Sequence, residues 1–208
     1  MIYKNILIDM GNVVIDFSPD YVLSKYTDDV KLINRLKDVI FFDEMWSKAD
    51  EGIVSDDEIY ENAIKKLDEK HHFLVKNIIN TWYKYKTENL KMRDIFLMLK
   101  NKGYKLYLCS NAAKSFYLYE DEINTFKYID GKVISADIKL LKPSKEYFMY
   151  VLEKFNLKAE ECFFIDDTIA NVKGAYKLGI DGYWFNGNVE LFYEFLKEVN
   201  ILWVIKLH

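Results

Sequence analysis

Cysteine, proline and histidine are scarce in this chain of 208 residues, which holds two cysteines, two prolines and three histidines. Cys109 and Cys162 lie inside apolar runs, and their spacing fits neither a metal site nor a redox motif. We therefore expect two small buried side chains, which fit a reducing cytoplasm. His71 and His72 lie in a polar helical segment and His208 is terminal, so we expect ordinary surface residues.

The chain also lacks an excess of positive charge and any long apolar run. Its formal net charge is -4, which argues against electrostatic binding to nucleic acid or to anionic membranes. No stretch approaches the length of a membrane span, and Asp9 interrupts the first apolar run, so we expect no secretory leader and no membrane anchor. We expect a cytoplasmic protein, and a monomer or weak dimer.

A helical block follows the first apolar run. Between residues 18 and 88, apolar residues recur at helical spacing. Ser55, with Glu58 three residues later, makes a capping box at the start of one of these helices. We expect residues 18–88 to form a small helical cap domain, inserted into a core domain that consists of residues 1–17 and 89–208.

Beyond the helical block, strands and helices alternate. Short apolar runs predict strands at 5–8, 104–109, 132–135, 162–165 and 181–184. The spacing of apolar residues predicts helices at 92–99, 115–122, 144–155, 168–178 and 189–199. This alternation predicts a doubly wound, Rossmann-like α/β fold around a parallel sheet. Residues 201–208 are either an edge strand or a packed tail.

Three of the predicted strands end abruptly in a small polar or acidic cluster. These clusters are Asp9, Ser110 with Asn111, and Asp166 with Asp167. Apolar runs of this kind are typical of strands buried on both faces of a parallel sheet, and ligands bind just beyond the carboxyl ends of such strands. We therefore expect carboxylates, a hydroxyl and an amide to meet in one crevice.

A carboxylate cluster in such a crevice indicates a divalent-cation site beside a nucleophile. Asp9 is an anion at neutral pH and can attack without a base, but a phosphate ester is also an anion. Mg²⁺ bound by hard oxygen ligands removes that repulsion. Asp166, Asp167 and the backbone carbonyl of Gly11 can supply such ligands.

Three further residues can hold phosphoryl oxygens. Ser110 and the amide of Asn111 can donate hydrogen bonds, and Lys142 offers a positive charge. Pro143 biases Lys142 toward an extended conformation, which helps to fix its direction. Each residue alone has an ordinary explanation as a turn, cap or loop residue, but four such motifs in order favour a functional site.

The ordered set of motifs resembles the haloacid dehalogenase-like hydrolase superfamily. The set is Asp9-x-Gly11-Asn12-Val13, Ser110-Asn111, Lys142-Pro143 and Asp166-Asp167. The resemblance spans almost the whole chain, and the helical block looks like the small cap of that family. The start of the set and the paired aspartates resemble the bacterial α-D-glucose-1-phosphate phosphatase branch.

The resemblance implies a nucleophile and a metal site. Asp9 would form an aspartyl-phosphate and would also bind Mg²⁺, together with the carbonyl of Gly11. Asp167 would be the main metal ligand of the last motif, with Asp166 as a direct or indirect partner.

The resemblance also implies how the phosphoryl group is held. Ser110 and Asn111 would bind it, and Lys142 would neutralise charge on the nucleophile and the phosphate. The implied activity is that of a Mg²⁺-dependent phosphatase that acts on a small phosphorylated metabolite, such as a sugar phosphate.

One position departs from the family pattern. Most phosphatases of the superfamily carry a second aspartate two residues after the nucleophile, which protonates the leaving group and later activates water; here that position is Gly11. Losing a general acid costs about 100- to 10,000-fold in rate. Either the substrate has a good leaving group, as an anomeric sugar phosphate or an acyl phosphate does, or another acid substitutes. Asp16 is the nearest candidate in sequence, and Glu44 or Glu51 would come from the cap.

Other functions remain as alternatives. If no other group replaces the general acid that is missing at Gly11, we expect a protein that has lost catalysis and has a binding or regulatory role. A dehalogenase usually lacks the paired acids and needs no Mg²⁺, and a phosphomutase would want the aspartate that Gly11 replaces. The aromatic segments 41–46 and 82–85 mostly pack the core of the cap, and we expect one or two of their side chains to face the substrate.

Overall fold

The computed structural model describes residues 3–202, and a parallel sheet lies at the centre of one lobe. Its strands, in the order β5-β4-β1-β6-β7, are β5 (Gly131–Ile134), β4 (Lys105–Ser110), β1 (Asn5–Ile8), β6 (Cys162–Asp166) and β7 (Asp181–Trp184). Every residue of β1 is buried, and β4 and β6 pair with it on either side. The predicted doubly wound α/β fold is confirmed.

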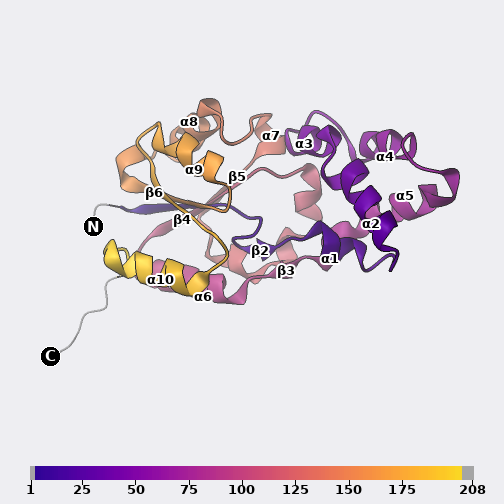
Figure 1. The fold of residues 1–208 in the computed structure, drawn as a ribbon. Helices are drawn as coiled ribbons and strands as arrows, with labels where there is room; N and C mark the ends of the chain where they lie inside the picture. The colour runs from indigo at the N-terminus through magenta and orange to yellow at the C-terminus, as the bar shows by residue number, and fades with distance from the viewer. Residues whose placement is uncertain (1–2, 203–208) are drawn as a thin grey trace.

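Helices cover both faces of this sheet (Figure 1). On one face lie α6 (Leu90–Asn101) and α10 (Val189–Glu198), and on the other lie α8 (Lys145–Lys154) and α9 (Ile169–Tyr176). Successive side chains of β1 point to opposite faces of the sheet, so this strand contributes to the core on both sides. Ile6 and Ile8 belong to a core cluster with Phe96, whereas Leu7 belongs to a second cluster with Tyr147 and Phe148. Both cysteines are buried, as expected.

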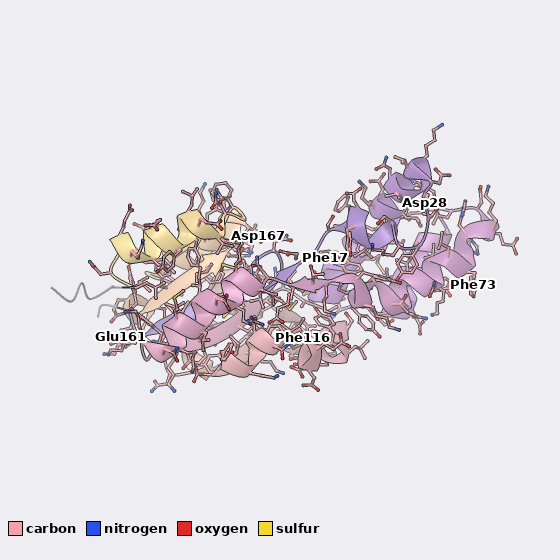
Figure 2. All side chains as sticks on the ribbon, turned by 90° about the horizontal axis from the view of Figure 1, so that it is seen from below. Phe17, Asp28, Phe73, Phe116, Glu161 and Asp167 are labelled. Carbon is pink, nitrogen blue, oxygen red and sulfur yellow. The ribbon has the colours of Figure 1, made fainter. Side chains whose placement is uncertain are left out.

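A second lobe, made of helices, lies beyond the sheet (Figures 1 and 2). Its elements are α1 (Pro19–Leu23), α2 (Val30–Leu36), the π-helical turn η1 (Lys37–Phe41), α3 (Glu44–Asp50), α4 (Asp56–Ile64), α5 (His72–Thr81) and the 3₁₀ turns η2 (Glu69–His71) and η3 (Trp82–Tyr85). The capping box of Ser55 and Glu58 is present at the start of α4. We call residues 18–88 the cap and the remainder the core, and these domain boundaries stay a prediction.

A short antiparallel pair of strands joins the two lobes. It consists of β2 (Ile15–Asp16) and β3 (Thr87–Glu88), and lies where the lobes meet (Figure 1). The expectation of helices alone up to residue 88 was therefore wrong for β3. A two-residue strand has too few side chains for its alternation to be seen in the sequence.

Residues 115–122, predicted as a helix, form 3₁₀ turns and not one continuous helix. Three 3₁₀ turns occupy this part of the chain: η4 (Lys114–Leu118), η5 (Glu120–Glu122) and η6 (Asn124–Tyr128). No described side chain caps the start of any of them. The carboxylate of Glu88 accepts two hydrogen bonds from Thr125, one from the backbone N–H at 2.7 Å and one from the hydroxyl at 2.5 Å. This contact with Glu88 fixes η6, which follows the predicted helix. Ser135, predicted as the end of a strand, begins the short α7 (Ser135–Ile138), and the turn η7 (Ala159–Glu161) precedes β6.

The described end of the chain packs on the core. Ile201 and Leu202 are buried, and the hydroxyl of Tyr104 donates a hydrogen bond to the carbonyl of Ile201 at 3.1 Å. Residues 203–208, on which the rest of the predicted edge strand or tail falls, lie outside the described residues. Between residues 3 and 202, no helix has the length and apolar character that crossing a bilayer demands.

Candidate active site

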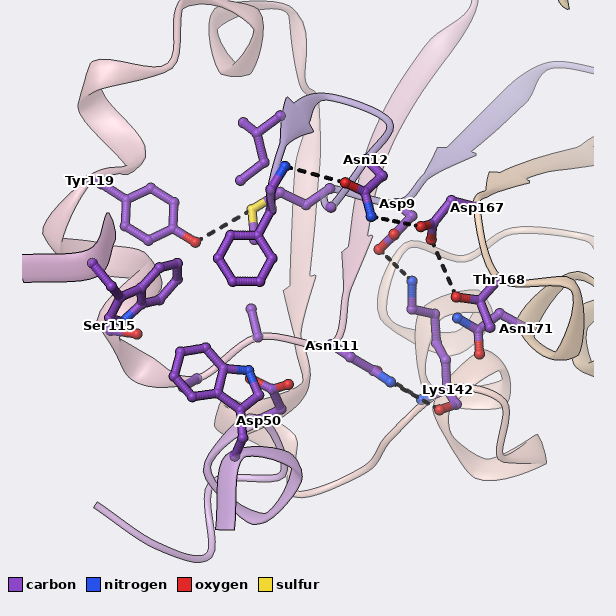
Figure 3. Close-up of a pocket in the computed structure, with 18 residues that line it drawn as sticks. Asp9, Asn12, Asp50, Asn111, Ser115, Tyr119, Lys142, Asp167, Thr168 and Asn171 are labelled. Carbon is purple, nitrogen blue, oxygen red and sulfur yellow. Dashed lines mark hydrogen bonds and ion pairs between the residues drawn. The ribbon is translucent and has the colours of Figure 1, made fainter. Parts of the chain in front are cut away.

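The carboxyl ends of three neighbouring strands meet at one edge of the sheet, and the predicted site lies there. Asp9 follows β1, Asn111 follows β4 and Asp167 follows β6, and all three line one cavity of about 240 Å³ (Figure 3). Ile8, the last residue of β1, pairs with Leu108 on one side and with Ile165 on the other, so β4 continues two residues and β6 one residue beyond the end of β1. The crevice expected beyond these strands is therefore present.

Lys142 lies between two carboxylates, of which Asp9 lines this cavity and Asp166 is buried behind it, outside the described lining residues. Its Nζ is 2.6 Å from Oδ1 of Asp9 and 2.7 Å from Oδ2 of Asp166, and its side chain is only 1% exposed. Burial alone would lower the pKa of Lys142, but the two carboxylates outweigh it and raise that pKa. Burial raises the pKa of Asp9 to about 7, against the opposing effect of the Lys142 ammonium.

Three carboxylates form a group that suits a divalent cation. Asp9, Asp166 and Asp167 each offer an oxygen, and these oxygens lie within 4.8 Å of one another. Hard, negatively charged oxygens at this spacing are the ligands that Mg²⁺ prefers. Gly11 also lines the cavity, as the expected carbonyl ligand requires.

Several polar residues orient the paired aspartates. The N–H of Thr168 donates to Asp166 at 2.7 Å, and the amide of Asn171 donates to the same carboxylate at 3.1 Å. The amide of Asn12 donates to Asp167 at 2.9 Å. Sequence reasoning gave none of these three residues a role, although Thr168 and Asn171 follow the acidic pair within five residues. Hydrogen bonds of this kind fix how metal ligands point.

The two residues expected to bind the phosphoryl group are placed differently. Asn111 lines the cavity and exchanges two hydrogen bonds with the backbone of Lys142, each 2.9 Å long. Ser110 is 1% exposed and is absent from the described residues that line the cavity. The structure thus brings Asn111, but not the side chain of Ser110, to the cavity.

None of the acids proposed in place of Gly11 lines the cavity within the described residues. Asp16 is exposed, because side chains alternate along β2 and Ile15 takes the cavity side. Glu44 is exposed and forms an ion pair with Lys48 at 2.7 Å. Glu51 lies one residue beyond the end of α3. Its neighbour Asp50, which sequence reasoning missed, does line the cavity.

Aromatic side chains form the wall of the cavity away from Asp9 (Figure 3). The aromatic residues that line the cavity are Phe17, Trp46, Trp82 and Tyr119. Their rings also pack on one another, with centroids 5.1 Å apart for Trp46 and Trp82 and 5.3 Å for Phe17 and Trp82. Trp46 and Trp82 come from the two aromatic segments of the cap, so both expected uses, cap packing and a face to the cavity, are realised by the same rings.

Comparison with known proteins points to one family. The model of the haloacid dehalogenase-like hydrolases matches residues 3–179. The chain is 24% identical over 185 residues to the sesquiterpene phosphatase astK of Aspergillus oryzae, covering 86% of this chain and 88% of that protein. It is 28% identical over 95 residues to the phosphorylated carbohydrates phosphatase of Thermotoga maritima, covering 45% and 44%.

A solved structure has the same fold. It is a wild-type enzyme of this family from Bacteroides thetaiotaomicron, in complex with magnesium and inorganic phosphate. The TM-score is 0.66 at 23% identity, and the match covers 87% of this chain and 93% of that chain.

Proposed function

The chain belongs to the haloacid dehalogenase-like hydrolases, and from this premise we propose that it is a Mg²⁺-dependent phosphatase that hydrolyses a small phosphorylated metabolite through an aspartyl-phosphate on Asp9. One observation carries the proposal. The carboxylate of Asp9 lies beside the Lys142 ammonium and within 4.8 Å of oxygens of two further aspartates, one of which, Asp167, lines the same cavity. A nucleophile, a compensating positive charge and a cation site are the parts that phosphoryl transfer from an anionic ester needs.

In the first step, an oxygen of Asp9 attacks phosphorus and the ester oxygen leaves. A divalent cation bound by the aspartates would reduce the repulsion between this carboxylate and the phosphate. Lys142 stabilises the charge that develops on the phosphoryl oxygens, and Asn111 holds Lys142 in position through its backbone. Burial of Asp9 favours its neutral form, whereas the Lys142 ammonium favours the anion that must attack.

In the second step, water attacks the phosphoryl group on Asp9 and releases inorganic phosphate. The aromatic wall and the cap above the cavity limit the entry of other water. The volume of about 240 Å³ lies below the range of about 300–1,000 Å³ that is common for drug-sized ligands, which favours a small substrate.

We propose a sugar phosphate, such as glucose 1-phosphate, as the substrate class to test first. An anomeric phosphate has a good leaving group, which suits a chain with glycine at position 11. The likeness to a phosphatase of phosphorylated carbohydrates supports the same class. The branch, a cytoplasmic location and a monomeric or weakly dimeric state stay predictions.

A panel of phosphorylated metabolites tests the proposal. We expect phosphate release that requires Mg²⁺ and stops in the presence of a chelator. Asp9→Asn should abolish it, since the amide cannot attack, while Asp130→Asn, whose carboxylate contacts Lys100 and Lys105 at the opposite end of the sheet, should not. Turnover by Asp9→Asn with unchanged Mg²⁺ dependence would refute the nucleophile. If no member of the panel is hydrolysed while Mg²⁺ still binds, the alternative of a binding or regulatory protein is favoured.

A further inference from the structure

The proposed reaction needs a proton donor at the leaving oxygen, and Gly11 has no side chain to give one. Among the described residues that line the cavity, three carry carboxyl groups: Asp9, Asp50 and Asp167. Asp9 and Asp167 belong to the proposed phosphoryl and cation site. Asp50 is the remaining carboxyl, and it lies across the cavity from Asp9, beside the aromatic wall (Figure 3).

Contacts between cap and core hold Asp50 in this place. It is the last residue of α3, and its carboxyl accepts a hydrogen bond from the backbone N–H of Ala113, two residues beyond Asn111. Its backbone carbonyl accepts a hydrogen bond from the hydroxyl of Ser135. Gly52 lies so close to the core that an added Cβ would be 2.4 Å from the carbonyl oxygen of Ala136. The end of α3 is therefore fixed against the core.

The surroundings of Asp50 favour a protonated carboxyl. Burial raises its pKa to about 7; the Ala113 N–H opposes the rise, and the charge of Asp9 adds to it. Because burial is the largest cause, most of the rise does not depend on the charge of Asp9. The other titratable side chains that line the cavity are Tyr119, Lys142 and Asp167.

We propose that Asp50 is the general acid and base that takes the place of the aspartate missing at position 11. This inference rests on the proposed function. As the bond between phosphorus and the ester oxygen breaks, its electron pair stays on that oxygen, which takes the proton of Asp50. The Asp50 carboxylate then accepts a proton from the water that attacks phosphorus, so that phosphate and the Asp9 carboxylate are released and Asp50 is protonated again.

An acid on the cap makes the first step depend on cap position. Asp50 reaches the leaving oxygen only while α3 is docked on the core near Ala113 and Ser135. Asp9 and Lys142, by contrast, both come from the core. Substrate bound with the cap away from the core would thus meet the nucleophile without the acid.

Two substrates of the same size separate acid catalysis from a structural role. Ethanol is a poor leaving group and needs a proton, whereas acetate leaves as an anion. We therefore propose to measure the first-turnover release of ethanol from ethyl phosphate and of acetate from acetyl phosphate, with Mg²⁺, in wild type and in Asp50→Asn. The asparagine oxygen can still accept the hydrogen bond from Ala113, which preserves the contact with the core. We expect ethanol release to fall by about 100- to 10,000-fold and acetate release to be retained.

A matched control and the outcomes that would contradict the proposal complete the test. Asp56→Asn removes another carboxyl of the cap whose pKa burial raises, and should leave both rates unchanged. In wild type, ethanol release should decline above about pH 7, while acetate release should not, a measurement that needs no variant. Equal losses for both substrates, no loss in Asp50→Asn, or a selective loss in Asp16→Asn instead would overturn the assignment. If wild type cleaves acetyl phosphate but not ethyl phosphate, the assignment of Asp50 is overturned and the proposed phosphatase activity stands. If wild type cleaves neither substrate, both proposals are overturned.

Discussion

At the scale of single residues, the site depends on one ammonium group between two buried carboxylates. Replacing Lys142 by methionine leaves Asp9 and Asp166 without the positive charge that lies 2.6 and 2.7 Å from them. We expect the free energy of unfolding, measured in denaturant without Mg²⁺, to fall by about 3–5 kcal/mol, because an unpaired buried charge is costly.

Lys91→Met is the matched control for this loss. Lys91 contacts Glu190 at 2.7 Å, almost the same distance, but both side chains are about 70% exposed. Water and salt screen such a pair, so we expect little or no change in stability. Equal losses in the two variants would mean that burial does not determine what the Lys142 contacts contribute.

Asn12 is a second residue whose replacement should change the cation site. Its amide nitrogen donates to Asp167 at 2.9 Å, and its amide oxygen accepts from the N–H of Phe17 at 3.2 Å. Asn12→Ala should weaken Mg²⁺ binding by about 10- to 100-fold, the usual effect of removing a group that orients a metal ligand. Calorimetric titration with Mg²⁺ measures this directly.

The control for Asn12 is Asn156, which shares its left-handed backbone, with φ of 51° against 53°. Asn156→Ala carries the same backbone strain, yet Asn156 lies just beyond α8 and outside the residues that line the cavity. Its Mg²⁺ affinity should match that of wild type. If both variants lose affinity equally, strain rather than the contact with Asp167 explains the effect.

The sequence identified residues that follow a strand, and it did not identify those that the cap delivers. Asp9, Asn111 and Asp167 were found because a buried strand points each of them to a known edge. Asp50 and the cavity wall depend on how α3 docks against residues 113 and 135, a contact that no local pattern encodes. One signal was available: Asp50 lies four residues after Trp46, on the same face of the helix.

At the scale of elements, the long periodic segments were predictable and the short ones were not. The parallel strands and the helices that cover them followed from apolar spacing, and the capping box fixed the start of α4. The 3₁₀ turns over 114–128 and the pair β2–β3 were missed. In those segments, single contacts such as that of Glu88 with Thr125 decide the conformation.

The loop between α3 and α4 is the element on which docking of the cap depends. Gly52 has φ of +74°, and a Cβ there would lie 2.4 Å from the carbonyl oxygen of Ala136. Gly52→Ala therefore adds a backbone clash to the strain of a left-handed residue, which itself costs about 1–2 kcal/mol. We expect a larger loss of stability in thermal unfolding than backbone strain alone would give.

Gly103→Ala separates the two causes. Gly103 has φ of +90°, but a Cβ there would meet nothing within 4 Å. This variant should lose only the energy of backbone strain. If Gly103→Ala lost as much stability as Gly52→Ala, the close approach of the loop between α3 and α4 to the core would not explain the loss of stability in Gly52→Ala.

At the scale of the whole molecule, both lobes build one cavity. The core supplies Asp9, Asp167 and Lys142, and the cap supplies Trp46, Asp50 and Trp82. Phe17 lies at the junction of the lobes and packs on rings from the cap, so the wall is continuous across the boundary (Figure 2). The partly buried carboxyl of Asp50 lies at this junction, and it links the stability of the whole molecule to pH.

The stability of the folded molecule should depend on pH through Asp50. Its pKa rises from 3.8 to about 7 in the fold, so between these values the folded chain keeps a proton that the unfolded chain releases. The stabilisation is complete below about pH 4 and is lost as the pH rises through 7. Without Mg²⁺, the free energy of unfolding of wild type minus that of Asp50→Asn should therefore fall by up to about 1.4 kcal/mol per pH unit across this window.

Asp43→Asn is the control. The free energy of unfolding of wild type minus that of Asp43→Asn should change with pH in the opposite direction. Burial would raise the pKa of Asp43, but hydrogen bonds from Lys66, from the N–H of Met45 and from Asn62 outweigh it, so its pKa is lowered. That carboxylate stabilises the fold above the acid range and loses its contribution as the pH falls. A flat difference for Asp50→Asn between pH 4 and 7, alongside the expected slope for Asp43→Asn, would mean that Asp50 is ionised in the fold. It would then be a contact between cap and core rather than a proton donor.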